Sequence, residues 1–296
     1  MSDRFQELAI FVRAAETGSF SRTARELGAT QPSISRTIAA LEARLGVKLF
    51  LRTTRRITPT DAGSVLLERA RHILPELEDA EDAARGTDSL RGLVRLAMPV
   101  AFGIREVIPR LPAFLSSHPQ LRIDFAMADG ADDLVAEGVD LALRLGPLAD
   151  SGFGTRKLAS APRRLVASPA YLERRGAPAA LADLAGHDGI FGPGGSGRRG
   201  WAALEDWRGQ AAPVTERFNV TSAEGVVALA KAGLGIAIAS LWMCRAELDA
   251  GDLIPILPDL PLSPAEAHAV FPAGRQPSRK VRVLTDYLAM ALRDAP

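Results

Sequence analysis

The residues whose types and spacing point most directly to chemistry lie at 19–38, which read SFSRTARELGATQPSISRTI. The apolar positions of a first helix are Phe20, Ala24 and Leu27. Gly28 follows them where helices end in the left-handed conformation, so it predicts the end of that helix. Thr30 offers an N-cap hydroxyl for a second helix, and Pro32 falls in its first turn, where a missing N–H is tolerated. Two short helices joined in this way are typical of a helix-turn-helix, which places its second helix in the major groove of DNA.

The second helix is expected to bury one stripe and to present a polar, basic face. The stripe consists of Ile34, Ile38, Leu41 and Leu45. Arg36 lies on the opposite face, and we expect it to contact a base or a nearby phosphate. An upstream amphipathic helix completes a small core with Phe5, Leu8, Phe11, Val12 and Ala15. The residues of these helices expected to contact DNA are Ser21, Arg22, Thr30, Gln31, Pro32, Ser33, Ser35 and Arg36.

An apolar segment from Val47 onwards turns back at 53–54 and predicts a β-hairpin wing. Arginine and threonine are residue types that hold phosphate oxygens and fix the register of a protein on DNA without reading its sequence. The wing residues expected to do so are Arg52, Thr53, Thr54, Arg55 and Arg56. Two packed helices with an ordinary solvated charged face are the alternative that the motif alone leaves open.

Charge is distributed unevenly along the chain. Residues 1–60 hold ten Lys and Arg against five Asp and Glu, a net charge of +5, although the whole chain carries only +1. The remaining residues therefore carry −4. Such asymmetry indicates a basic module for nucleic acid, residues 1–60, attached to a part with another role.

The segment from Phe11 to Gly63 resembles the LysR-type transcriptional regulators, and it reads FVRAAETGSFSRTARELGATQPSISRTIAALEARLGVKLFLRTTRRITPTDAG. The resemblance extends more loosely beyond residue 90. It implies an α/β protein with an all-α N-terminal part: a winged helix-turn-helix, a long linker helix that makes dimers, and a two-lobed effector domain similar to periplasmic binding proteins. The function that it implies is sequence-specific DNA binding in transcription regulation, modulated by a small-molecule effector.

Residues 61–90 independently predict a linker helix and a hinge. Six apolar positions recur at alternating spacings of four and three, which is the a/d seam of a helix that pairs with a partner helix. They are Leu66, Ala70, Ile73, Leu77, Ala80 and Ala84. Packing of this helix on its own domain is the alternative. Pro75 removes one helical hydrogen bond, so we expect a kink near Arg71 to Pro75, and residues 86–89 are expected to form the hinge.

Strands and helices alternate from residue 91 to 296, which indicates α/β architecture. The first unit consists of strands at 93–97, 121–127 and 139–145 with helices at 101–116 and 131–137. A second unit has strands at 164–167, 217–220 and 235–239 with a helix at 223–232, and a strand at 267–271 and a helix at 278–292 follow. The resemblance implies that these last elements return to the first lobe. Lobe I is then expected at about 91–160 plus 267–296, and lobe II at about 161–266.

A cleft between two such lobes is expected to bind the effector, because ligands of open parallel sheets lie where helix N-termini point N–H groups inward. The candidate residues are Pro99, Val100, Ala101, Ala128, Arg144, Thr221 and Ser222. Plain N-capping by the two hydroxyls and ion pairing of Arg144 remain alternatives. Alanines stand at 97, 101 and 128, where the family commonly has serine or threonine around the first helix N-terminus and after the second strand. Both a carboxylate held by backbone N–H groups and a more apolar effector are therefore left open.

Signatures of enzymes are weak in this chain. Residues 192–200 contain G-x-G-x-x-G twice. Only the short Ile190-Phe191 precedes them and no clear helix start follows, whereas a dinucleotide site needs both a strand and a helix, so we interpret them as a mobile surface loop at the mouth of the cleft. Cys244 is the only cysteine and is expected to be a buried small side chain, and His187 a turn residue. We expect no enzyme activity, no cofactor and no metal site.

The N-terminus lacks the apolar stretch of an export signal, and no segment is long and apolar enough for a membrane span. We therefore expect a cytoplasmic protein rather than a binding protein of transport. The expected partners are double-stranded DNA, a small-molecule effector, a second copy in a homodimer or homotetramer and, for an activator, RNA polymerase. The alternative function is a small-molecule binding protein that binds DNA only non-specifically.

Overall fold

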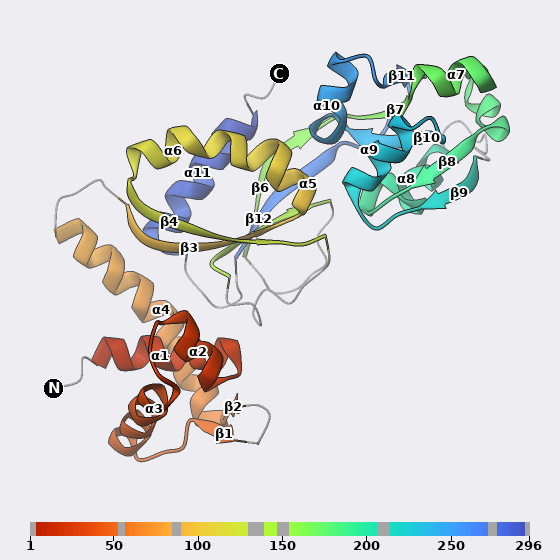
Figure 1. The fold of residues 1–296 in the computed structure, drawn as a ribbon. Helices are drawn as coiled ribbons and strands as arrows, with labels where there is room; N and C mark the ends of the chain where they lie inside the picture. Colours follow the sequence, from red (N-terminus) through yellow and green to blue (C-terminus); the bar gives the residue numbers. More distant parts are fainter. Residues whose placement is uncertain are drawn as a thin grey trace.

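The computed structural model describes residues 4–52, 57–84, 90–129, 139–146, 154–205, 214–271 and 277–293. A helical head, a long helix and two α/β lobes follow one another along the chain (Figure 1). The head contains α1 (Arg4–Thr17), α2 (Phe20–Glu26), α3 (Gln31–Leu45) and the antiparallel strands β1 (Phe50–Arg52) and β2 (Ile57–Pro59). The predicted helix-turn-helix and wing are confirmed as elements of the fold.

The turn between α2 and α3 is built as the sequence predicts. Gly28 has φ of 62°, a left-handed conformation that a side chain would strain. The Thr30 hydroxyl accepts a hydrogen bond from the Ser33 N–H at 3.4 Å, and Pro32 lies in the first turn of α3. These three residues fix where α3 begins and therefore which of its residues face outward.

The core of the head is closed by an aromatic ring from the wing. Phe50 lies with its ring centroid 5.2 Å from that of Phe11 and 5.8 Å from that of Phe20. Three residues expected in this core are instead exposed by two fifths or more: Phe5, Leu27 and Leu45. Each lies at an element's end, where the helix has run past the core. The first wing strand also begins at 50 rather than near 47, since residues 47–49 are not part of it.

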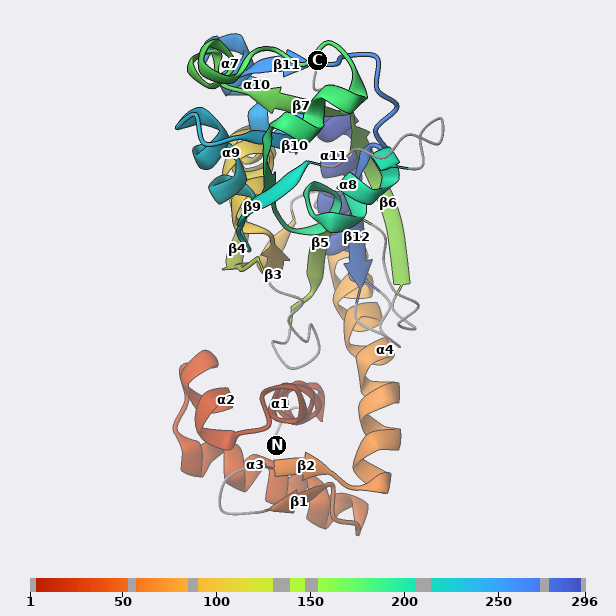
Figure 2. The ribbon, with the colours of Figure 1, turned by 90° about the vertical axis from the view of Figure 1, so that its right-hand side faces the viewer.

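Helix α4 (Asp61–Ala84) leads from the head to the lobes and continues through Pro75 without interruption (Figure 2). The prediction for Ala70 was wrong: it is fully buried in the core of the chain's own head, with Leu66 partly buried beside it. Val65 and Ile73 are 64% and 45% exposed. The exposed apolar side of α4 therefore keeps Ile73 of the predicted seam and adds Val65, which lies one position before Leu66. The hinge expected at 86–89 lies outside the described residues.

The first lobe is a five-stranded sheet in the order β4-β3-β5-β12-β6. Its strands are β3 (Arg91–Met98), β4 (Gln120–Met127), β5 (Leu141–Leu145), β6 (Gly154–Ala161) and β12 (Ala265–Phe271). β4 and β5 pair with β3 in parallel, whereas β12 runs antiparallel between β5 and β6. Helices α6 (Leu111–Ser117) and α11 (Arg279–Arg293) lie together on one face of this sheet (Figure 1). The Tyr287 hydroxyl on α11 donates to the Arg110 carbonyl just before α6.

The helix expected at 101–116 is not one regular α-helix. It consists of α5 (Val100–Phe102), a π-helical turn η1 (Gly103–Val107), a 3-10 turn η2 (Ile108–Arg110) and α6. Pro109 and Pro112 lack the N–H groups that a continuous α-helix would use here, which explains the change of helical type. The helix expected at 131–137 lies outside the described residues.

The second lobe is a five-stranded sheet in the order β11-β7-β10-β8-β9. The strands are β7 (Arg163–Ala167), β8 (Asp188–Phe191), β9 (Thr215–Asn219), β10 (Ile236–Ser240) and β11 (Ile254–Ile256). Side chains alternate between its faces: Val166 and Ala237 belong to a core shared with the first lobe, whereas Leu165 and Ile236 belong to a separate core. The helices of this lobe are α7 (Pro169–Arg175), α8 (Arg198–Glu205), α9 (Ala223–Lys231) and α10 (Leu241–Asp249), with 3-10 turns η3 (Leu181–Gly186) and η4 (Gly194–Ser196).

The chain passes between the two sheets twice. Pro162 joins β6 of the first sheet to β7 of the second, and residues 257–264 return from β11 to β12. The two crossovers are held together, because the Arg163 guanidinium donates to the carbonyls of Ser263 and Pro264 at 2.6 and 2.9 Å. This pair of crossovers is the covalent connection between the lobes, and any change in their relative angle must pass through it.

Candidate nucleic-acid interface and small-molecule pocket

Helix α3 presents most of the residues expected to contact DNA. Gln31, Pro32 and Arg36 are exposed, and Ser33 and Ser35 are half-buried. The Arg36 side chain contacts the Pro32 carbonyl of its own helix at 3.4 Å and otherwise extends into solvent. Ser21, Arg22 and Thr30 are exposed nearby, although the Thr30 hydroxyl is engaged as the N-cap. The result is an exposed polar surface at the N-terminal half of α3, the part of a recognition helix that reaches base edges.

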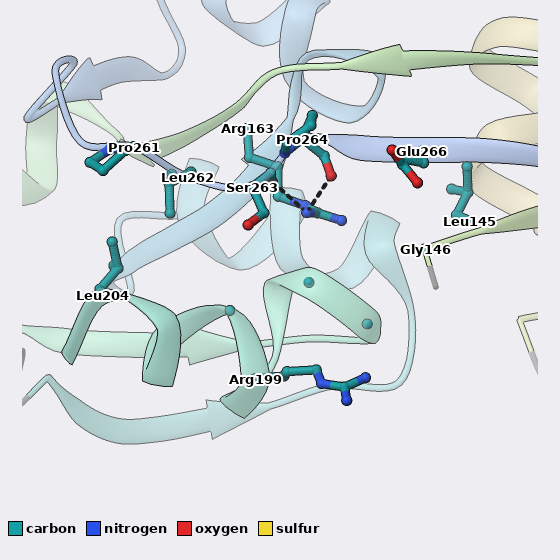
Figure 3. A pocket seen from close by; sticks show the side chains of 13 residues that line it. Leu145, Gly146, Arg163, Arg199, Leu204, Pro261, Leu262, Ser263, Pro264 and Glu266 are labelled. Carbon is teal, nitrogen blue, oxygen red and sulfur yellow. Dashed lines mark hydrogen bonds between the residues drawn. The ribbon is translucent and has the colours of Figure 1, made fainter. Parts of the chain in front are cut away.

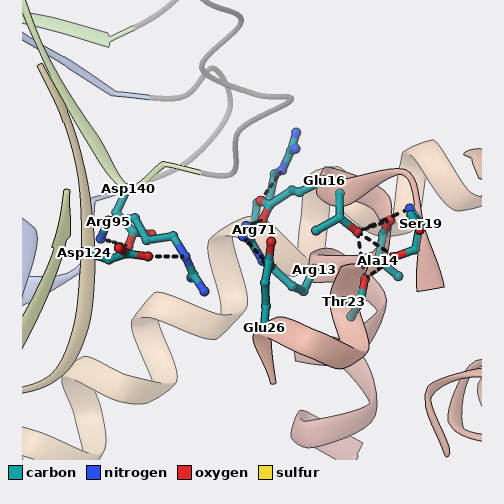
Figure 4. A network of polar contacts seen from close by, with 11 residues as sticks. Arg13, Ala14, Glu16, Ser19, Thr23, Glu26, Arg71, Arg95, Asp124 and Asp140 are labelled. Carbon is teal, nitrogen blue, oxygen red and sulfur yellow. Dashed lines mark hydrogen bonds and ion pairs between the residues drawn. The ribbon is translucent and has the colours of Figure 1, made fainter. Parts of the chain in front are cut away.

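The described acidic residues of the head are paired with cations of the same chain. Glu16 and Glu26 both contact Arg13, at 3.2 Å and 2.5 Å, and Glu16 also lies 3.8 Å from Arg71 of α4 (Figure 4). A third carboxylate, Glu7, contacts Arg44 at 2.9 Å, and Glu42 contacts Lys48 at 2.8 Å. Among the described residues, Arg22, Arg25 and Arg36 have no ion-pair partner. The positive charge of the head is thus left on its outer face.

Glu42 also ties the recognition helix to the wing. Its carboxylate is almost fully buried and accepts hydrogen bonds from the N–H groups of Leu49 and Phe50 at 2.9 and 3.3 Å. Burial alone raises the pKa of Glu42, but these bonds and the bond from Lys48 outweigh it, and the pKa is lowered. An ionised Glu42 therefore fixes the base of the wing against α3. The side chain of Arg52 and residues 53–56, with the predicted Thr53, Thr54, Arg55 and Arg56, lie outside what the structure describes.

The two helix N-termini expected to bind the effector differ in how far their polar groups are already hydrogen-bonded within the chain. The Val100 N–H donates to the carboxylate of Asp129 at 3.0 Å, so an acid of the chain occupies the place of the expected anion. Ser222 caps α9 without a side-chain hydrogen bond, and Thr221 is exposed. The remaining candidates are Pro99 and Arg144, which are half-buried, Ala101, which is buried, and Ala128, which is exposed.

The lobes are in direct contact beside α5 and α9. Phe102 packs edge-on against Trp242 with ring centroids 5.2 Å apart. Arg105 of the first lobe makes two contacts with Glu224 of α9, at 2.6 and 2.8 Å, and two with Glu247 of α10, both at 3.0 Å. The hydrogen bonds from Arg105 hold the pKa of Glu224 below its ordinary value, despite some burial. This side of the interlobe boundary is a packed, charge-paired interface.

A pocket of about 560 Å³, a size suited to small molecules, opens beside the two crossovers that join the lobes (Figure 3). Its walls come from the end of β5, the first residue of β7, the crossover at 261–264, the start of β12, the glycine-rich segment 192–200 and α8. The lining residues are Leu145, Gly146, Arg163, Gly194, Gly195, Arg199, Gly200, Leu204, Pro261, Leu262, Ser263, Pro264 and Glu266. None of the seven residues predicted to bind the effector lines it. Residues 192–200 were expected only at the mouth of a cleft, and α8 was missed although it begins at Arg198, directly after them.

Two residues that could in principle react, a cysteine and a histidine, are buried side chains with hydrogen-bond partners inside the fold. Cys244 is fully buried, its thiol donates to the Ser240 carbonyl at 3.3 Å, and burial raises its pKa to about 12, so the prediction of a small buried side chain is confirmed. His187 is buried beside Tyr171, with Nδ1 3.2 Å from the phenol oxygen, and burial lowers its pKa. Throughout the described residues there is no cluster of three or more His, Cys, Asp or Glu side chains that could hold a metal ion. Among the described helices, none combines the length and apolar character needed to cross a bilayer.

A winged helix-turn-helix with an outward basic surface, joined by one helix to two lobes around a pocket, defines a class: DNA-binding proteins with an effector domain. Family models agree with this assignment. The model of the bacterial regulatory helix-turn-helix protein, lysR family, matches residues 5–64, and that of the LysR substrate binding domain matches residues 87–293.

Individual relatives match over nearly the full length. An HTH-type transcriptional regulator of Haemophilus influenzae is 33% identical over 280 residues, which cover 94% of this chain and 97% of the relative. The regulator CrgA of Neisseria meningitidis serogroup C is 32% identical over 296 residues, with 99% and 98% covered. The solved structure of CrgA from N. meningitidis superposes with a TM-score of 0.57 at 30% identity and covers 97% of each chain. The chain belongs to the LysR-type transcriptional regulators: it is a DNA-binding regulator of transcription with an effector-binding domain.

Proposed function

We propose that the N-terminal half of α3 reads operator DNA, with Arg36 at a base edge or an adjacent phosphate and Gln31, Ser33 and Ser35 beside it. The observation that carries this proposal is the distribution of charge in the head. Every carboxylate of its described residues is held by a cation of the same chain, and Arg36 is left exposed on the polar surface of α3. Ser21, Arg22, Thr30, Pro32 and the wing residues Arg52, Thr53, Thr54, Arg55 and Arg56 then contact the backbone.

We propose residues 1–60 as the DNA-binding domain, 61–90 as linker and hinge, and 91–296 as the effector domain, with lobe I at about 91–160 plus 267–296 and lobe II at about 161–266. An effector acts by binding one relative arrangement of the lobes more tightly than others, since only differential affinity shifts a population. The role is regulatory rather than catalytic, and it is exercised in the cytoplasm, where bacterial DNA lies. An activating form of the protein would also contact RNA polymerase.

The protein is proposed to act as a homodimer or homotetramer through α4. The face offered to a partner helix contains Val65, Ile73, Leu77 and Ala80, because Ala70 and part of Leu66 are committed to the chain's own head. Paired heads would then contact half-sites about one helical turn apart, or multiples of it. A Val65→Ser/Ile73→Ser variant is expected to lower the mass measured by light scattering, whereas an unchanged mass would assign oligomerisation to another surface.

The decisive experiment measures fluorescence anisotropy of the full chain on DNA that flanks its own gene and on scrambled DNA, over a salt series. Arg36→Ala is expected to weaken binding to the flanking DNA by roughly tenfold to a hundredfold, the usual cost of one specific contact. The matched control is Arg44→Gln, at the far end of the same helix, where the side chain contacts Glu7.

The outcomes separate the candidate roles. Selective binding to the flanking DNA that Arg36→Ala reduces and Arg44→Gln leaves intact supports the proposed reading surface. Equal, steeply salt-dependent binding to both DNAs would favour a small-molecule binding protein with only non-specific DNA binding. Selective binding that survives Arg36→Ala would show that another surface reads the sequence.

A further inference from the structure

We infer that the pocket beside the crossovers binds a small organic anion, with its negative group held by Arg163, with Arg199 as a second lining cation, and with its apolar part against Leu145, Leu204 and Leu262. The inference rests on the proposed role of residues 91–296 as the effector domain. It concerns a different site from the one expected at the helix N-termini of α5 and α9, because the pocket shares none of those residues.

Arg163 is a cation whose described partners carry no charge. Its guanidinium donates to the carbonyl oxygens of Ser263 and Pro264, and it lies so close to Gly195 that a Cβ there would fall 2.3 Å from Cζ. Burial lowers the pKa of Arg163, and the nearby carboxylate of Glu266 does not offset that effect. An anion in the pocket would supply the compensating charge that the protein lacks at this point.

Glu266 does not fill this role, although it lines the same pocket. Its carboxylate contacts Lys157, and His268 lies 3.3 Å from it. The contact with Lys157 and the one with His268 hold the pKa of Glu266 below its ordinary value. The acid of the pocket is therefore engaged by Lys157 and His268, which do not line it, and the two lining arginines remain in excess over it.

Arg199 supplies the second cation from the first turn of α8. It is exposed, and no residue within the described part of the chain forms an ion pair or hydrogen bond with it. Its neighbour Arg198 is different, because it makes two contacts with Glu216, at 2.8 and 2.9 Å, and does not line the pocket. In Figure 3 the side chains of Arg163 and Arg199 lie on either side of the glycine-rich segment, and both line the pocket.

The position of the pocket beside both crossovers explains how binding there would affect the relative arrangement of the lobes. Arg163 directly follows the crossover at Pro162, and Ser263 lies on the other crossover. The hydrogen bond between them therefore joins the two connections of the lobes. A carboxylate that takes some of the guanidinium's hydrogen bonds would compete with that link or reinforce it. The anion is therefore bound at the point about which the lobes would turn.

The test is calorimetric titration of the full chain with two pairs of probes: phenylacetate and phenylacetamide, and hexanoate and hexanamide. In each pair the shape is nearly the same and only the charge differs. The expected result is saturable binding of at least one anion, with its amide weaker by about tenfold or more. Arg163→Gln and Arg199→Gln are each expected to weaken the anion by about tenfold or more, and Arg198→Gln, the matched control, by less than about twofold.

Several results would overturn the inference. These are failure of both anions to bind, equal binding of acid and amide, or an equal loss in Arg198→Gln and Arg199→Gln. Arg163→Lys keeps the charge, so it should retain more affinity than Arg163→Gln; equal losses would assign Arg163 to holding the crossovers only. Anisotropy on operator DNA, measured on the same samples, separates the two proposals, because selective DNA binding without anion binding defeats this inference alone.

Discussion

The head and the effector domain each contain two kinds of arginine, and they place the second kind in opposite settings. In both regions one arginine is clamped between two carboxylates: Arg13 by Glu16 and Glu26, and Arg105 by Glu224 and Glu247. Both regions also hold arginines without an acidic partner among the described residues. In the head these arginines are exposed to solvent, whereas Arg163 of the effector domain is half-buried in a pocket.

That difference between an exposed surface and a pocket separates two kinds of ligand. An exposed surface with spaced cations meets many phosphates of a long polyanion at once, and it gains from the release of counterions. A pocket with two cations and apolar walls encloses a single small anion and excludes water from it. The clamped arginines have a third role, because their charge pairs with carboxylates of the same chain and stabilises the fold. Replacing each kind of arginine should therefore change a different measurement.

The largest effect is expected when a clamped arginine is removed. Arg105→Met leaves Glu224 and Glu247 facing each other at the interlobe boundary, and Glu247 is nearly buried. Unpaired carboxylates in such a place should lower the free energy of unfolding by about 3 kcal/mol, as measured by urea denaturation. In contrast, Arg199→Gln should change it by less than about 0.5 kcal/mol, because that side chain is exposed.

A triple variant tests the cause of that loss. Arg105→Met with Glu224→Gln and Glu247→Gln removes the clamp and both charges together. It should recover most of the lost stability, because neutral groups in place of a whole ion-pair network are often nearly as stable. If the triple variant were as unstable as Arg105→Met, packing by the arginine stem rather than its charge would hold the lobes together.

The next effect in size concerns the wing. Arg55→Gln/Arg56→Gln should weaken binding to flanking and scrambled DNA alike, by about tenfold at low salt, since these residues are proposed to contact phosphates. The slope of log K against log salt should fall by about one for each arginine removed. A selective loss on the flanking DNA would instead mean that the wing reads bases.

The sequence predicted the head better than the pocket because the head is local. The end of α2 at Gly28, the cap at Thr30 and the exposed Arg36 all follow from spacings within some twenty residues of α2 and α3. The pocket instead joins residues near 145, 163, 195 and 264, which only the path of the chain through two sheets brings together. One signal was available: Gly195 and Gly200 have no room for a Cβ, and such glycines mark a close approach of chain segments.

Helix α4 shows a different kind of error. The a/d spacing correctly indicated a long amphipathic helix, but an apolar stripe does not say whether a partner or the chain's own head covers it. Ala70 is covered by the head, because α1 packs along the first half of α4. Val65, which is outside the predicted seam, is left exposed. The apolar periodicity was enough to predict that α4 is a helix. Which of its apolar residues remain exposed depends on how the head packs against it.

The smallest expected effect is a pH dependence in the head. The pKa of Glu42 is lowered in the folded chain, so its ionised form stabilises the head. That contribution is fully present above the unfolded value, about 4.5, and is lost as pH falls through the lower folded value. The melting temperature of wild type should therefore fall more steeply from pH 5 towards pH 3 than that of Glu42→Gln, which carries no titrating group there.

The comparison isolates Glu42 because the other carboxylates of the head are present in both proteins. Glutamine can still accept the N–H groups of Leu49 and Phe50, so the variant should fold with the wing in place at neutral pH. It is expected to be less stable there, since it loses the charge-assisted bond from Lys48. Parallel melting curves down to pH 3 would show that the buried carboxylate carries no net charge stabilisation, and that hydrogen bonding alone seats the wing on α3.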